Sequence, residues 1–124
     1  MIYMRGETKV DDSIFQVLPG GAADNGVIRG CRVTEYKKNN VMVHVSEGTV
    51  WVDGRLVQLS SEYVYIPVNH QHQERFDWVV VDAWGNLLAT PNPDKRWLKL
   101  ARVWVSPNPG LVQGVEDKRV FVTD

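Results

Sequence analysis

Residues 41–57, VMVHVSEGTVWVDGRLV, decide the fold of this chain. Apolar and polar residues alternate, so Val41, Val43 and Val45 fall on one face of a strand. The alternation breaks at Ser46-Glu47-Gly48 and again at Asp53-Gly54. Asp-Gly between two such runs is typical of a two-residue type I′ hairpin turn, because both turn positions need positive φ. The stretch therefore predicts a meander of short antiparallel strands.

The same signals recur along most of the chain. Ten glycines and six prolines separate runs that are rich in β-branched and aromatic residues. Helical periodicity is ambiguous only near residues 97–103, so little helix is expected. We expect an all-β fold, either an antiparallel β-sandwich or a partly open barrel of short strands. The expected strands are residues 30–36, 41–46, 49–52, 56–60, 62–68, 76–82, 87–90, 97–105 and 119–122.

Length and composition indicate one domain of ordinary globular character. The chain has 124 residues, 44% hydrophobic and 23% charged. A formal charge of -1 argues against a general nucleic-acid binder, whose affinity depends on neutralising phosphates. The apolar start is too short for a signal peptide, and no run is long enough for a membrane span. Synthesis and folding in a reducing cytoplasm are expected.

The first 25 residues differ from the rest of the chain. They contain several glycines and aspartates and show little periodicity, with one short possible strand at residues 13–18. Such a segment has few apolar side chains with which to order itself. We expect residues 1–25 to form an extended, loop-rich N-terminal arm that rests on the domain or on a neighbouring subunit. Residues 26–124 are expected to form the single β domain.

Two pairs of charged residues are candidates for structural or interface roles. Arg75 and Asp77 are two residues apart on an expected strand, so their side chains share a face. A bidentate pair there could fix a neighbouring strand or the segment that contains Asp117 and Arg119. An ion pair within the domain is favoured over a clamp between subunits, because such pairs beside a core strand are common.

Five tryptophans are many for a chain of this length. Trp51 and Trp104 each alternate with flanking valines, so both rings face outward if the valines face the core. Outward aromatic rings favour protein interfaces. Two alternatives remain: strands buried on both faces, and a platform that stacks on carbohydrate rings.

The sequence contains no recognisable catalytic arrangement or cofactor motif. His70 and His72, with Glu74, are spaced like metal ligands on a strand, but zinc needs about four ligands and only His44 remains. Ligands from symmetry-related copies could complete a site, whereas a solvated loop is the simpler interpretation. Cys31 is the only cysteine, which rules out an intrachain disulfide, and we interpret it as a packed side chain.

Five segments, in order, resemble a module of tailed-phage baseplate and tail-fibre proteins. They begin at residues 26–34, GVIRGCRVT, and at the hairpin VSEGTVWVDGRLV. ERFDWVV, residues 74–80, is similar to the module's arginine-x-aspartate strand. LARVWV, residues 100–105, and VEDKR, residues 115–119, are similar to its last strand and its closing acidic-x-arginine motif.

The resemblance implies a small β domain that organises tail components, usually as a trimer or ring. It leads us to expect a non-enzymatic virion structural protein of a tailed phage, in the tail, baseplate or fibre-attachment region, that contacts itself and other virion proteins. No nucleic acid, membrane, metal or cofactor is expected. The alternatives are a capsid decoration protein and a carbohydrate-binding module for receptor recognition.

Overall fold

The computed structural model describes residues 25–107 and 110–122, and these residues form β-strands joined by turns and loops. No helix occurs among them, and hence none that is long and apolar enough to cross a membrane. The expected strand at residues 13–18 and all of the expected arm except Asn25 lie outside the described residues. The strands are β1 (Gly26–Gly30), β2 (Val33–Glu35), β3 (Met42–Val45), β4 (Gly48–Val52), β5 (Arg55–Leu59), β6 (Glu62–Tyr65), β7 (Arg75–Val81), β8 (Leu87–Thr90), β9 (Leu98–Val105) and β10 (Val112–Asp117).

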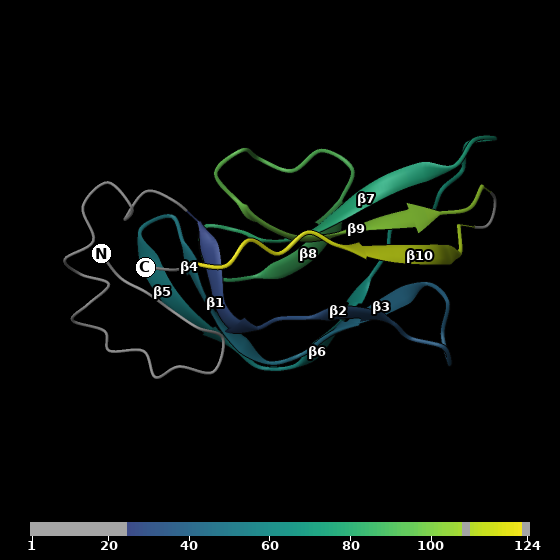
Figure 1. The fold of residues 1–124 in the computed structure, drawn as a ribbon. Helices are drawn as coiled ribbons and strands as arrows, with labels where there is room; N and C mark the ends of the chain where they lie inside the picture. The colour runs from purple at the N-terminus through teal and green to yellow at the C-terminus, as the bar shows by residue number, and fades with distance from the viewer. Residues whose placement is uncertain (1–24, 108–109, 123–124) are drawn as a thin grey trace.

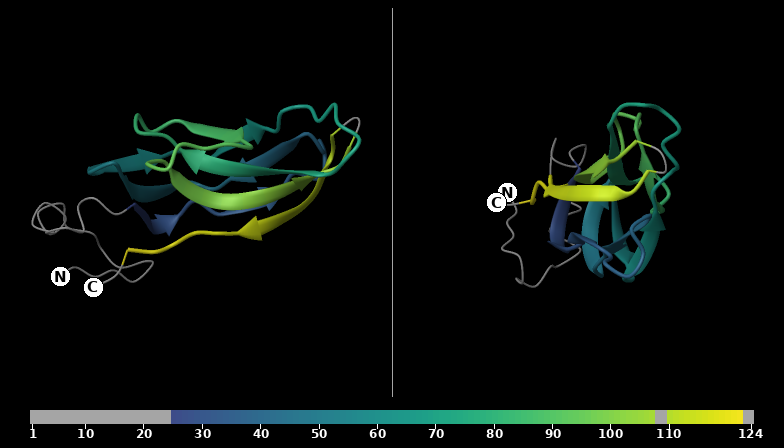
Figure 2. Two further views of the ribbon diagram at one scale, coloured as in Figure 1. Left: turned by 90° about the horizontal axis from the view of Figure 1, so that it is seen from above. Right: turned by 90° about the vertical axis from the view of Figure 1, so that its right-hand side faces the viewer.

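The strands form three antiparallel sheets. Sheet A has the order β1-β4-β5, sheet B has β2-β3-β6, and sheet C has β10-β9-β7-β8. Figure 1 shows sheet A at one end of the molecule and sheet B beneath sheet C. The molecule is longer along its strands than across them (Figure 2). The expected all-β, antiparallel fold of short strands is confirmed, and the sheets form a sandwich rather than a closed barrel.

Sheets A and B are two halves of one bent meander. β1 continues into β2, β3 into β4 and β5 into β6, each across a two-residue break, and the strand order is the same in both halves. At the bend, the Cys31 amide donates to the Glu47 carbonyl (3.2 Å), and the Ser46 amide donates to the Arg32 carbonyl (2.9 Å). Cys31 has a φ of 58°, which turns the chain from one sheet into the next.

The Asp53-Gly54 turn forms as predicted. Asp53 has a φ of 50° and Gly54 a φ of 76°, both in the left-handed region that a type I′ turn requires. The register across the turn pairs Val52 with Arg55 and Val50 with Val57. Two successive left-handed residues therefore set the register of sheet A, and alternate residues of β4 face the core.

The core lies between sheet C and the bent meander. Its residues come from all three sheets and are mostly valines, because alternate β-branched residues pack well on a pleated surface. Fully buried members include Val43, Val45, Val50, Val79 and Val103. At about 25 cal/mol per Å² of apolar surface removed from water, this layer is the main source of stability.

Two predictions at the ends of the domain are wrong. Residues 30–36 are not one strand, because Cys31 bends the chain between β1 and β2. The last strand is β10, Val112–Asp117, and not residues 119–122. The segment after β10 lies along β1 instead: the Val27 amide donates to the Val120 carbonyl (2.8 Å), and the Val122 amide donates to the Val27 carbonyl (3.0 Å).

Candidate functional site

The outer face of sheet C carries a cluster of aromatic rings around one arginine. The register places Phe76 opposite Trp104, and Trp78 opposite Arg102, on the neighbouring strands β7 and β9. Phe76 is 39% exposed and packs edge-on against Trp104, with ring centroids 5.2 Å apart. Because alternate residues of both strands fill the core, these four side chains face away from it. We call Phe76, Trp78, Arg102 and Trp104 the aromatic face.

Arg102 holds the aromatic face together. Its guanidinium carbon lies 4.9 Å from the Phe76 ring centroid, 5.2 Å from that of Trp104 and 5.9 Å from that of Trp78. Such cation–π contacts contribute about 0.5–2 kcal/mol each, depending on how far they are desolvated. On β10, the Glu116 carboxylate accepts a hydrogen bond from Arg102 Nη2 at 3.0 Å. The rings are thus held in place before any partner binds.

Of the two tryptophans expected to face outward, only Trp104 does so. Trp51 is 5% exposed, so the prediction that it faces solvent is wrong. The reason is that β4 is the middle strand of sheet A and all five of its residues are buried. The alternative that some strands are buried on both faces therefore applies to β4 and Trp51.

Arg75 and Asp77 form a buried pair that joins two sheets. Arg75 Nε and Nη2 donate to the two Asp77 carboxylate oxygens at 2.7 and 3.0 Å. The Asp77 side chain is fully buried, and that of Arg75 is 17% exposed. Arg75 also donates to the Val68 carbonyl (2.9 Å) and to that of Pro67, just beyond β6. The pair therefore fixes the backbone that follows the neighbouring strand β6. A clamp between subunits stays a prediction.

Asp117 and Arg119 form a second pair, at the other end of sheet C. Arg119 Nη2 lies 2.8 Å from the Asp117 carboxylate, and Arg119 Nη1 donates to the Gly30 carbonyl at 2.9 Å. Asp117 pairs in register with Ala101, whereas Arg75 pairs with Val105. The two charged pairs therefore do not contact each other, so the alternative in which Arg75 and Asp77 fix the Asp117 and Arg119 segment does not apply. Hydrogen bonds from Arg119 hold the pKa of the Asp117 carboxyl below its ordinary value.

Sheet B carries a second exposed aromatic group. The Tyr63 ring lies 4.7 Å from Tyr36 and 5.0 Å from His44, measured between centroids. Tyr63 is 50% exposed, and Tyr65 on the same strand is also exposed. We call Tyr36, His44, Tyr63 and Tyr65 the tyrosine face. Since sheets B and C form opposite layers of the sandwich, the two aromatic surfaces lie on opposite sides.

The His70 and His72 segment is a loop. Both histidines are exposed. The buried Asn69 organises the loop, because its amide donates to the Gln73 carbonyl at 2.9 Å and its carbonyl accepts from Gln71 at 3.0 Å. The described residues contain no group of three or more metal-ligating side chains. The loop agrees with the simpler interpretation, and a site completed by symmetry-related copies stays the untested alternative.

Cys31 is a packed side chain at the bend. It is fully buried, and burial raises the pKa of its thiol to about 11. Because the thiolate is the reactive form, a raised pKa and burial both disfavour reaction of this thiol at neutral pH.

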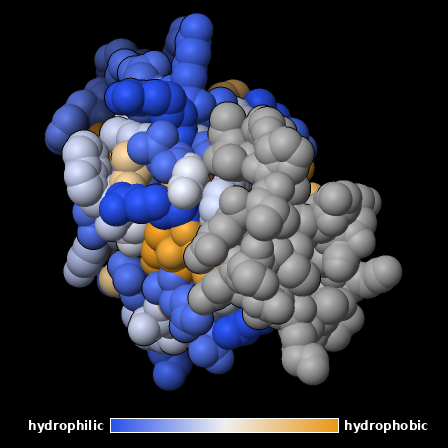
Figure 3. All heavy atoms as spheres, turned by 90° about the vertical axis from the view of Figure 1, so that its left-hand side faces the viewer, coloured by the Kyte–Doolittle hydropathy of each residue, from blue (hydrophilic) through white to orange (hydrophobic). Residues whose placement is uncertain are grey.

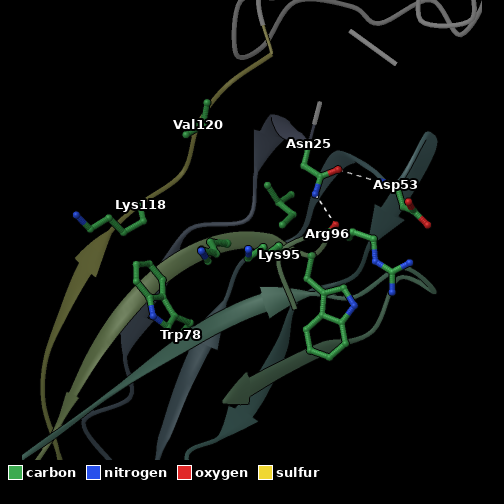
Figure 4. Close-up of a pocket in the computed structure, with 10 residues that line it drawn as sticks. Asn25, Asp53, Trp78, Lys95, Arg96, Lys118 and Val120 are labelled. Atoms are coloured by element: carbon green, nitrogen blue, oxygen red, sulfur yellow. Dashed lines mark hydrogen bonds between the residues drawn. The ribbon is translucent and has the colours of Figure 1, made fainter. Parts of the chain in front are cut away.

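A groove lies beside the aromatic face, between the loop before β9 and the segment after β10. Its volume is about 760 Å³, and Trp78, Trp97, Lys95 and Lys99 are among the residues that line it. Asn25 closes one end: its amide donates to the Arg96 carbonyl (2.6 Å), and its carbonyl accepts from the Asp53 amide (2.9 Å), as Figure 4 shows. Where coloured residues are visible at the end of the molecule with the β4–β5 turn, they are mostly hydrophilic, with a hydrophobic area near the centre (Figure 3).

Sequence reasoning missed the groove, the tyrosine face and the role of Arg102. Trp78 and Arg102 stand 24 positions apart, and only the register of β7 against β9 brings them together. The alternation in LARVWV does place Arg102 and Trp104 off the core face, and that signal could have identified part of the site. Lys99 shares that face only because the register of β9 shifts between Lys99 and Ala101.

Comparison with known proteins finds no family model that matches the chain and no curated protein with significant similarity.

Proposed function

We propose that this chain is a non-enzymatic structural protein of a tailed-phage virion that assembles as a trimer or ring in the tail, baseplate or fibre-attachment region. The ordered sequence resemblance supports this proposal. The charged residues of the two similar motifs also support it. Arg75-x-Asp77 and Asp117-x-Arg119 each fix a segment of backbone within the domain. These pairs give the module rigidity, and the surfaces that dock lie elsewhere.

The aromatic face is the observation that carries the proposal. Protein interfaces are enriched in tryptophan, phenylalanine and arginine, and hot spots are desolvated clusters of these residues. Here Phe76, Trp104 and Arg102 are held by one another and by Glu116, so docking orders few side chains further. Pre-organisation of this kind lowers the entropic cost of association.

A ring also needs a second, different surface. Cyclic assemblies with more than two copies use head-to-tail contacts, in which one patch of each subunit meets another patch of the next. The aromatic face and the tyrosine face lie on opposite sides of the sandwich and provide such a pair, and faces on opposite sides suit a ring of many copies better than a trimer. We therefore place the contact between the aromatic face of one copy and the tyrosine face of the next.

Mixing two variants tests this arrangement. Trp104→Ser impairs the aromatic face and Tyr63→Ser impairs the tyrosine face, so each purified variant should be a monomer by light scattering. Mixed in equal amounts, they retain one intact face each and should form a dimer that cannot grow. Trp84→Ser is the matched control, because Trp84 is 74% exposed in the turn between β7 and β8, outside both faces. It should assemble like the wild type.

Three results count against the proposal. A wild-type chain that stays monomeric at high concentration contradicts assembly. A Trp104→Ser variant that still assembles excludes the aromatic face. A Tyr63→Ser variant that assembles alone excludes the head-to-tail arrangement. Capsid decoration remains the alternative location, since it uses the same kind of assembly, and an image of labelled particles distinguishes head from tail.

A further inference from the structure

The groove beside Trp78 contains two ammonium groups that no carboxylate pairs with among the described residues. Lys99 Nζ lies 5.0 Å from the Trp78 ring centroid, and the Lys95 side chain, from the loop before β9, extends towards Trp78 (Figure 4). Neither lysine forms an ion pair with another described residue. Two positively charged side chains therefore line a groove that also has tryptophan side chains in its walls.

The other charged residues of the groove are turned to other partners. Lys118 Nζ is paired with Glu116 at 3.2 Å, and Arg96 is paired with Asp94 at 3.2 Å. The Asp53 carboxylate points away from Trp78 (Figure 4). The interior of the groove is consequently positive, and a bound anion could contact both free ammonium groups.

We propose that this groove binds an acidic saccharide, with a carboxylate between Lys95 and Lys99 and a sugar ring packed against an indole. A volume of about 760 Å³ is that of a small-molecule site. The C–H face of a pyranose ring offers apolar surface to an aromatic ring, while its hydroxyl groups stay hydrogen-bonded to water. A molecule that contacts both the lysines and an indole needs a carboxylate and an apolar ring face. An acidic sugar has both.

The sheet topology argues against a peptide as the occupant. An extended peptide gains its affinity by adding a strand to a free sheet edge. Trp78 and Lys99 lie on β7 and β9, the two inner strands of sheet C, so their backbone groups are already paired. Single-stranded nucleic acid is also disfavoured, because it needs a basic channel that follows several phosphates.

Calorimetric titration with trigalacturonate tests the proposal. The wild type should bind it and should not bind the same trisaccharide with its carboxyl groups methyl-esterified. The double variant Lys95→Gln/Lys99→Gln should bind at least about tenfold more weakly, with a smaller dependence on salt. The matched control is Lys37→Gln/Lys38→Gln, which removes the same charge from exposed positions between β2 and β3. It should bind like the wild type.

Four outcomes would overturn the proposal. The first two are no binding at millimolar trigalacturonate, and binding of the methyl ester as tight as that of the acid. The other two are an equal loss of affinity in the two double variants, and tighter binding of tetraglutamate or an oligothymidylate than of trigalacturonate. All four lysines are exposed, so the variants are expected to fold, and circular dichroism checks this. Because Trp78 belongs to both the groove and the aromatic face, binding is measured on dilute, unassembled protein.

Discussion

Replacing Arg75 with methionine should destabilise the domain strongly, because it leaves a buried carboxylate without its partner. The Asp77 side chain has no exposed surface, and Arg75 supplies both hydrogen bonds to it, at 2.7 and 3.0 Å. Breaking a buried ion pair on one side costs about 3–5 kcal/mol. The bonds from Arg75 to the Pro67 and Val68 carbonyls position that segment but contribute little to this loss of stability, because water can replace the guanidinium at those exposed acceptors.

Urea unfolding followed by tryptophan fluorescence measures this loss. The midpoint should fall while the slope of the free energy against urea stays the same. The double variant Arg75→Met/Asp77→Leu should recover much of the stability, since apolar replacement of a buried pair is often close to neutral. Arg96→Met is the control, because the Arg96–Asp94 pair is largely exposed. If Arg75→Met costs no more than Arg96→Met, or the double variant recovers nothing, the buried-pair reasoning is wrong.

Three further substitutions or treatments have defined outcomes. Gly48→Ala should lower the free energy of unfolding by about 1–3 kcal/mol, measured by thermal unfolding, because the new Cβ would lie 2.3 Å from a backbone oxygen of the paired strand. At Gly114 the nearest atom would lie 3.7 Å from the new Cβ, so alanine should be tolerated there. A thiol reagent at mildly alkaline pH should modify Cys31 only as fast as the domain opens, and a rapid reaction of the folded protein would contradict its burial. The pKa of Asp117 is lowered by Arg119, so the pair stabilises the fold above the ordinary aspartate pKa and loses this effect as pH falls through the folded value. Below about pH 4, the free energy of unfolding of the wild type should therefore fall more than that of Asp117→Asn, with a difference of less than about 1 kcal/mol. Equal losses in the two proteins would exclude a stabilising role for the Asp117–Arg119 pair.

The parts of the fold that depend on local patterns could be predicted from the sequence. Asp53-Gly54 admits few backbone conformations other than the turn observed, and the alternation of Val43 and Val45 leaves only one face for the core. β10 was missed because Gly114 and the acidic residues after it have low strand propensity. That strand forms because its backbone pairs with the edge of β9. The pairing depends on the tertiary structure and cannot be read from the local sequence.

The candidate sites were less predictable, since they depend on register. Trp104 was correctly expected to face outward because its valine neighbours alternate with it. The same reasoning failed at Trp51, because alternation cannot show that both faces of an inner strand are covered. The groove forms because Lys95 in a loop and Trp78 on a strand lie near each other in the fold. No spacing in the sequence indicates that they do.

Hydroxyl-radical footprinting of the wild-type chain, dilute and assembled, tests the docking proposal most directly. Phe76 and Trp104 should lose reactivity on assembly, and Tyr63 should lose reactivity with them, whereas Trp84 should react equally in both states. Unchanged reactivity at Phe76 and Trp104 in the assembled protein, or protection confined to Trp84, would contradict the account.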